Sequence, residues 1–82
     1  MKTRRLELGT RNLVGARVTL ARNRAGLRQN ELLARLQTAG IDISAPALSL
    51  LEGQKRPVFD YELAALADCL HVSIDWLLGR EG

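Results

Sequence analysis

The sequence contains few of the residues that form disulfides, metal sites or aromatic cores. Its 82 residues include one Cys, one His, one Phe, one Tyr and one Trp. A single cysteine excludes an internal disulfide and fits a reducing cytosol. With so few aromatic residues, the core of this one-domain chain must consist mainly of Leu, Ile, Val and Ala, as in small helical domains.

Long apolar segments are missing as well. No run of hydrophobic residues approaches the roughly 20 that cross a membrane as a helix. The basic start of the chain, residues 1–5, is not followed by the apolar core of a signal peptide. We therefore expect a soluble cytoplasmic protein.

Catalytic and metal-binding patterns are equally scarce. Cys69 and His71 are two residues apart, and no third ligand accompanies them to form a zinc site. The sequence has no nucleophile–base arrangement and no glycine-rich phosphate loop. We expect no enzymatic activity, no metal and no cofactor.

Charge is abundant and unevenly distributed along the chain. Residues 1–35 contain nine Lys or Arg and two Glu, a net charge of +7, whereas residues 36–82 carry a net charge of −4. A basic region on a small domain is typical of a surface that binds nucleic-acid phosphates. A solvated face rich in arginine is the alternative.

Apolar residues recur at helical spacing and strand-like alternation is absent, so the sequence predicts an all-α fold. Asparagine, serine or aspartate precedes four segments as a helix cap, and glycine follows three of them. Five helices are predicted. The first follows Asn12 and runs to Ala25, the second extends from about Gln29 to Gln37, and the third follows Ser44 and ends at Gly53. The fourth follows Asp60, with Leu63, Leu66, Ala67 and Leu70 facing inward, and the fifth follows Ser73 and runs from Ile74 to Leu78.

The second and third of these segments are the most informative. Both are short, carry leucines at helical spacing, and are separated by a turn at residues 38–43. Two short helices joined at an angle, in a basic chain, are typical of a motif that places one helix in a DNA groove.

The residues resemble the helix-turn-helix family of the Cro and CI phage repressors, also called XRE-like. The resemblance covers roughly residues 13–79 and depends on the order and spacing of several short motifs. These are Arg22 followed by Gly26-Leu27-Arg28-Gln29, then Leu32 and Leu36, Leu48-Ser-Leu-Leu-Glu-Gly53 with Lys55-Arg56, Asp60-Tyr-Glu-Leu63, and Leu70-His-Val-Ser-Ile-Asp-Trp-Leu-Leu-Gly79. The resemblance implies a compact five-helix, lambda-repressor-like domain at residues 12–82, preceded by a basic arm at residues 1–11, that binds operator DNA as a homodimer.

The resemblance also assigns roles to individual residues. Gln29 matches a glutamine that anchors a DNA phosphate at its helix N-terminus, where the helix dipole favours an anion. Arg28 stands where a Ser, Thr or Asn cap is usual and brings a guanidinium to the same phosphate. Lys55 and Arg56 match loop cations that contact the DNA backbone. The alternatives are an ordinary polar residue at Gln29 and solvated charges in the loop.

Two further features concern packing between the helices. Arg22 and Glu52 match a structural ion pair that joins the first helix to the end of the third. Gln29 and Glu52 are 23 positions apart here, several more than is usual in the family, so the turn between the two helices is longer. We expect Ile41 and Ile43 to bury this extended turn.

The third helix would present its exposed side to the major groove. Arg, Gln and Asn, which read bases by paired hydrogen bonds, are missing from it. Recognition of the DNA sequence would therefore depend on DNA shape, on half-site spacing, or on the basic arm in a minor groove. The alternative for the arm is a disordered tail. The expected groove-facing residues are Ser44, Ala45, Pro46, Ala47 and Ser49.

Three hydrophobic residues leave other interactions open. Leu50 stands at a usually polar position of the third helix, and Leu20 lies off the core stripe of the first. Exposed leucines at these positions would suit a protein partner. Trp76, between the inward-facing Ile74 and Leu77, is either a dimer contact or a core residue.

We therefore predict sequence-specific binding of double-stranded DNA by a transcriptional regulator, most simply a repressor of phage or mobile-element type. A protein-interaction module of antitoxin type on the same fold is the first alternative. Architectural DNA binding without sequence specificity is the second.

Overall fold

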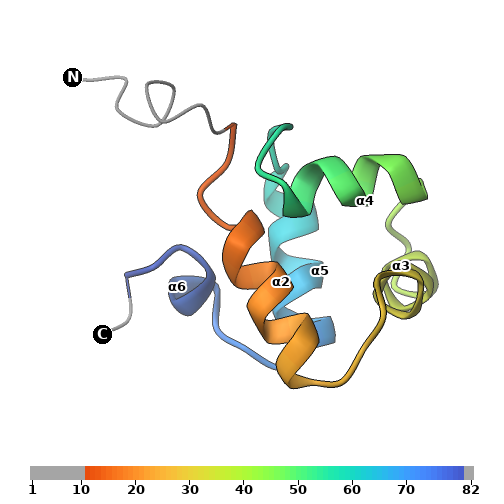
Figure 1. Cartoon of the computed structure of the whole chain (residues 1–82), viewed down its shortest axis with the longest axis horizontal. Coiled ribbons are helices and arrows are strands. Elements are labelled where there is room, and N and C mark those ends of the chain that lie inside the picture. Colours follow the sequence, from red (N-terminus) through yellow and green to blue (C-terminus); the bar gives the residue numbers. More distant parts are fainter. Residues whose placement is uncertain (1–10, 81–82) are drawn as a thin grey trace.

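Five α-helices account for most of residues 11–80, the part of the chain that the computed structural model describes (Figure 1). They are α2 (Gly15–Arg24), α3 (Gln29–Thr38), α4 (Ala45–Glu52), α5 (Asp60–Leu70) and α6 (Ile74–Leu77). Residues 11–80 contain no strand, so the predicted all-α class is confirmed for this range. Nearly all of the predicted basic arm, residues 1–10, lies outside the described residues.

The start of α2 lies later than the sequence predicts. Asn12 still acts as a cap, because its Oδ1 accepts hydrogen bonds from the backbone amides of Val14 (3.0 Å) and Gly15 (2.7 Å). These bonds close a tight turn, so Val14 rather than Asn12 holds the N-cap position. The helix ends at Arg24, one residue before the predicted end, and Gly26 adopts a left-handed backbone (φ +72°) after the Ala25 cap, as expected of the residue that stops it.

α3 and α4 lie where the sequence places them, and Ile41 and Ile43 anchor the long turn between them to the core as expected, while the other residues of the turn are exposed. Ser44 caps α4, because its Oγ accepts a hydrogen bond from the Ala47 amide at 3.2 Å. Ile43 is buried and Ile41 is half-buried, and both pack against the core. The Gln37 side chain donates to the Ile43 carbonyl oxygen at 3.1 Å, which ties the turn to α3.

α5 and α6 differ from the prediction at their ends. Asp60 is the first residue of α5 rather than its cap, and the Glu62 carboxylate accepts instead from the Phe59 backbone amide at 3.0 Å. Ser73 caps α6 as expected, since its Oγ accepts from the Trp76 amide at 2.9 Å. The helix is one residue shorter than predicted.

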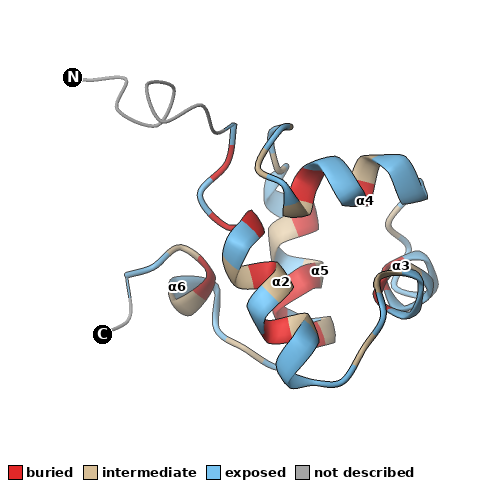
Figure 2. Ribbon diagram, in the orientation of Figure 1, coloured by how far each residue is buried: buried red, intermediate tan, exposed pale blue. Residues whose placement is uncertain are grey.

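The hydrophobic core lies between α2, α3, α4 and α5, and leucine fills most of it (Figure 2). Leu77 brings α6 onto this core, whereas Ile74 is 41% exposed, so the predicted inward position of Ile74 is wrong. α6 is a single turn, and Trp76, Leu77 and Leu78 occupy its contact with the core. The largest fully buried side chains are Val18, Leu32, Leu36, Leu48, Leu51, Leu66 and Leu77. None of the helices within residues 11–80 has the length and hydrophobicity that crossing a membrane requires.

The N-terminal end of α2 packs directly against the C-terminal end of α4. A Cβ atom at Gly15 would overlap the carbonyl oxygen of Leu51 and lie 2.8 Å from that of Glu52. Glycine is the residue that allows two helix backbones to approach this closely. The contact fixes one end of α4 relative to α2.

Candidate nucleic-acid interface

α3 and α4 form the helix pair that would carry a DNA-binding function. Figure 1 shows α3 nearly end-on while α4 runs across the view above it, so the two helices cross at a steep angle. They pack against each other, and each also packs against another helix, α3 against α5 and α4 against α2. α2 and α5 thus support the pair.

An ion pair joins the end of α4 to α2. Arg22 Nε and Glu52 Oε2 are 2.9 Å apart, and a second bond of 3.0 Å joins Nη2 of the same arginine to Oε1. Thr19 donates its hydroxyl to Glu52 at 3.0 Å, and Arg22 also donates to the Leu27 carbonyl oxygen at 2.9 Å. The Arg22–Glu52 pair that the resemblance implies is therefore present, and both side chains are mostly buried.

The exposed face of α4 consists of small or apolar side chains, all uncharged. Ala47, which the sequence assigns to this face, is only partly exposed, because part of its side chain packs against the core. It lies about one turn before the buried Leu51, so both side chains point to the same side of the helix. Leu50, at 46% exposure, is the largest side chain on the face. The other exposed residues of this helix and its cap are Ser44, Ala45, Pro46 and Ser49.

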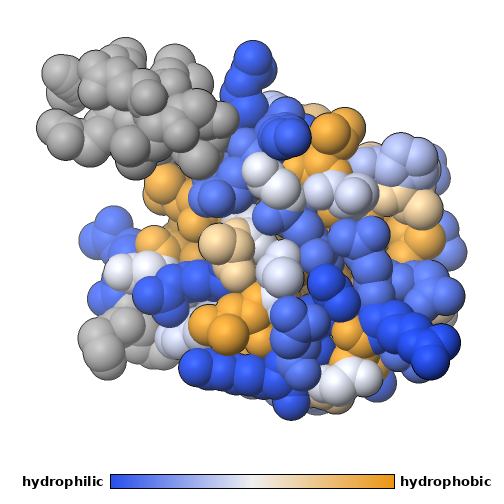
Figure 3. All heavy atoms as spheres, viewed as in Figure 1, coloured by the Kyte–Doolittle hydropathy of each residue, from blue (hydrophilic) through white to orange (hydrophobic). Residues whose placement is uncertain are grey.

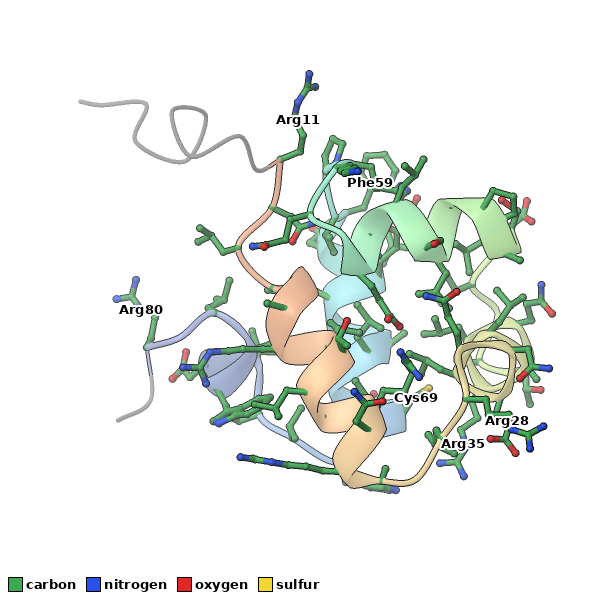
Figure 4. The ribbon with its side chains drawn as sticks, viewed as in Figure 1. Arg11, Arg28, Arg35, Phe59, Cys69 and Arg80 are labelled. Carbon is green, nitrogen blue, oxygen red and sulfur yellow. The ribbon has the colours of Figure 1, made fainter. Side chains whose placement is uncertain are left out.

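The N-terminal end of α3 carries an exposed arginine. Arg28 holds the N-cap position without a side-chain cap bond, and Glu31 Oε1 accepts from the Arg28 amide at 2.7 Å. Gln29, the first residue of α3, is half-buried. Figure 4 shows the Arg28 and Arg35 side chains extending outward from the α3 side of the molecule. The helix dipole and the guanidinium favour an anion here, although the Glu31 carboxylate opposes it.

One of the two cationic residues in the loop after α4 forms an ion pair within the fold. Arg56 donates to both carboxylate oxygens of Glu62, at 3.1 Å each, and its side chain is only 20% exposed. The guanidinium of Arg56, which the sequence predicts as a DNA contact, therefore holds the loop against α5. Lys55 is exposed and is the cation of this loop that DNA could reach.

The basic half of the sequence is divided between two sides of the fold within residues 11–80. Arg17 and Arg24 lie over the Trp76 ring, with their guanidinium carbons 4.9 and 5.8 Å from its centre. Arg28 and Arg35 lie on the α3 side instead (Figure 4). Figure 3 shows small hydrophobic groups scattered among hydrophilic residues over the visible face. Within the described residues, these four arginines therefore do not form one basic patch.

Two buried polar residues organise this region, and the sequence alone did not indicate their long-range partners. Asn12 is 7% exposed, and its Nδ2 donates to the carbonyl oxygens of Leu51 (3.1 Å) and Arg56 (2.8 Å). It links the start of α2, the end of α4 and the loop. Glu62 is 4% exposed. A glutamate in the first turn of a helix is a sequence sign of a cap, but its pairing with Arg56 is visible only in the fold.

The remaining candidate residues lie elsewhere on the surface. Trp76 is half-buried, packs against the core and lines a groove beside α2. Leu20 is exposed. Cys69 is half-buried, and burial raises the pKa of its thiol more than the nearby Arg35 lowers it. Within the described residues, no group of three or more His, Cys, Asp or Glu side chains could hold a metal ion.

Comparison of the chain with models of protein families, with curated proteins and with solved structures found no match.

Proposed function

We propose that this protein is a helix-turn-helix DNA-binding regulator of the Cro and CI type, with α4 in the major groove of operator DNA. The proposal includes a lambda-repressor-like arrangement of the helices, a homodimer as the binding unit, and repression of a phage or mobile-element promoter in the cytoplasm. The function is one of binding, without catalysis or a cofactor.

The observation that carries the proposal is that α4 is fixed on one side and uncovered on the other. The Arg22–Glu52 pair and the close contact at Gly15 hold its C-terminal end against α2. Packing on α3 and the Ser44 cap hold its N-terminal end. A recognition helix needs this combination of rigid support and an open outer face.

In the proposed complex, the contacts divide between DNA phosphates and base edges. Arg28 and the N-terminal end of α3 at Gln29 hold one phosphate, and Lys55 holds another beyond the C-terminal end of α4. The hydroxyls of Ser44 and Ser49 can donate to or accept from several bases, so they discriminate weakly. Most of the specificity then comes from DNA shape and from the spacing of two half-sites.

A symmetric dimer would set that spacing. Two copies of α4 in successive major grooves on one side of the duplex lie about 34 Å apart, which is one turn of DNA. Trp76 is the residue that we propose for the dimer contact, because a half-buried tryptophan has an apolar surface that a second copy can cover.

The test is a fluorescence-anisotropy titration of the full chain against a randomised duplex pool at several salt concentrations, with sequencing of the bound fraction. The proposal predicts an enriched two-fold symmetric motif with half-sites about one turn apart. Salt-dependent binding without an enriched motif would indicate an architectural protein. No binding at low salt would contradict any DNA-binding role.

A second candidate function is binding of a protein partner through the same side of the fold, as in an antitoxin. The uncharged face of α4 and the exposed Leu50 favour it. Phe59 and Tyr61 favour it too, because both are exposed and their rings stack with centroids 5.6 Å apart. Loss of partner binding in Leu50→Asp, together with no DNA binding by the unmodified chain, would select this alternative.

A further inference from the structure

A groove of about 600 Å³ opens between the C-terminal end of α2 and the connection from α5 to α6. Ala21, Ala25, Leu70 and Val72 form its apolar lining, and Arg24 and Trp76 complete one side. Figure 1 shows that α6 and α4 lie on different sides of α2. The groove is therefore separate from the proposed DNA-binding face.

The backbone of the α5–α6 connection shapes one end of this groove. His71 adopts a left-handed conformation (φ +57°) directly after α5, and the Val72 amide then donates to the Ala67 carbonyl oxygen at 3.1 Å. The chain turns sharply at this point. As a result Val72 and Trp76, which come from either side of the Ser73 cap, line the same groove as residues of α2.

Charge makes the groove suitable for an anion. Arg24 is exposed, and its guanidinium carbon lies 5.8 Å from the centre of the Trp76 ring. Arg17 lies 4.9 Å from the same ring and adds a second positive charge nearby. The lining residues, all within the described part of the chain, include no carboxylate that would compete for Arg24. An arginine beside an apolar surface favours a carboxylate attached to an apolar body.

We propose that this groove binds a small organic carboxylate with an apolar or aromatic body. The carboxylate pairs with Arg24, and the body lies against Ala25, Val72 and the Trp76 ring. The volume lies within the range of about 300–1,000 Å³ that is usual for small-molecule sites. This site goes beyond the proposed DNA binding and does not depend on it, although the ligand and a dimer contact at Trp76 would compete for the same ring.

The test is a titration of the full chain with 3-phenylpropionate. Trp76 is the only tryptophan of the sequence, so its fluorescence reports on the surroundings of this one side chain. The ¹H–¹⁵N resonances of Ala25 and Val72, which also line the groove, give a second readout that separates ligand binding from a change in dimerisation. We expect saturable changes with a dissociation constant on the order of 1 mM, because the probe is small. The neutral 3-phenylpropanamide should bind about tenfold more weakly, since it lacks the charge that pairs with arginine.

Variants at exposed arginines separate this site from a general effect of charge. Arg24→Gln should weaken binding of 3-phenylpropionate about tenfold, and Arg24→Lys should weaken it only about threefold because the charge remains. Arg35→Gln removes an exposed arginine on α3 that has no role in the proposed sites and should leave the affinity unchanged. Equal binding of acid and amide, equal effects of Arg24→Gln and Arg35→Gln, equal displacement by inorganic phosphate, or no saturable change would each overturn the proposal.

Discussion

The buried carboxylate of Glu62 accepts hydrogen bonds from Arg56 and from the Phe59 backbone amide. Arg56 donates from Nη1 and Nη2 at 3.1 Å each, and the Phe59 amide donates at 3.0 Å. The same side chain therefore caps α5 and fixes the loop that comes from α4. Because Asn12 also donates to the Arg56 carbonyl oxygen, the loop is held from both α2 and α5.

Replacing Glu62 with glutamine should destabilise the fold. Glu62→Gln leaves the mostly buried Arg56 guanidinium without its counter-charge, and we expect the free energy of unfolding to fall by about 2 kcal/mol. The value lies below that for a fully buried pair because the Arg56 side chain is 20% exposed. Urea denaturation measures it. Asp42→Asn, at an exposed carboxylate, is the control and should change stability by less than about 0.5 kcal/mol; equal losses in both variants would contradict the role of Glu62.

Adding a methyl group at Gly15 should separate α2 from α4. The new Cβ would meet the carbonyl oxygens of Leu51 and Glu52, so Gly15→Ala should cost about 2–3 kcal/mol although alanine favours helix formation. Thermal denaturation followed by circular dichroism gives the loss. Ala16→Gln changes the next, exposed position and should stay within about 0.5 kcal/mol. A stabilised Gly15→Ala protein would mean that the two helices are not in close contact.

The sequence predicts the features of this fold that depend on interactions between residues close together in the chain. Ser44 and Ser73 cap helices, and Gly26 ends one, because each acts on amides or backbone angles within a few residues. The extended turn was also predictable, since Ile41 and Ile43 are the two large apolar residues of its segment.

The parts that the sequence does not predict depend on partners far apart in the chain. From the sequence, Arg56 is predicted to be an exposed cation of the loop, and only the fold shows its ion pair with Glu62. Asn12 reads as a simple cap, while its amide group bonds to carbonyl oxygens 39 and 44 positions away. Within the candidate site, Arg56 is therefore held in an ion pair and Ala47 is partly buried against the core.

Cys69 should be a slow nucleophile in the folded protein. Burial raises the pKa of its thiol above the ordinary range, so less reactive thiolate is present at a given pH than in the unfolded chain. Alkylation by iodoacetamide at pH 8 should be slower for the native protein than for the protein in urea. The raised pKa of Cys69 also predicts how stability depends on pH. The free energy of unfolding should fall as the pH rises past the ordinary thiol pKa, because the thiol ionises at a lower pH in the unfolded state. Equal alkylation rates would contradict the burial effect.

Lys55 should contribute to DNA affinity without contributing to stability. If it contacts a phosphate as proposed, Lys55→Ala should weaken binding to every duplex alike and reduce the slope of log affinity against log salt by about one. Anisotropy titrations over a salt series measure both quantities. Arg80→Ala is the matched control, because Figure 4 shows Arg80 on the side of the molecule opposite Arg28. A similar reduction of the slope in both variants would show that the contribution of Lys55 is a general effect of net charge.

A charge placed on the outer face of α4 distinguishes the two candidate functions. Leu50 is 46% exposed and outside the buried core, so Leu50→Lys should alter the free energy of unfolding by less than about 0.5 kcal/mol. If α4 enters the major groove, the new ammonium lies near phosphates, and the affinity for DNA should rise with a salt slope steeper by about one. If the face binds a protein instead, the same lysine places a charge in an apolar contact and weakens it. Leu20→Lys changes an exposed leucine on α2 and serves as the control for added charge. Unchanged DNA affinity in Leu50→Lys would exclude α4 as the recognition helix.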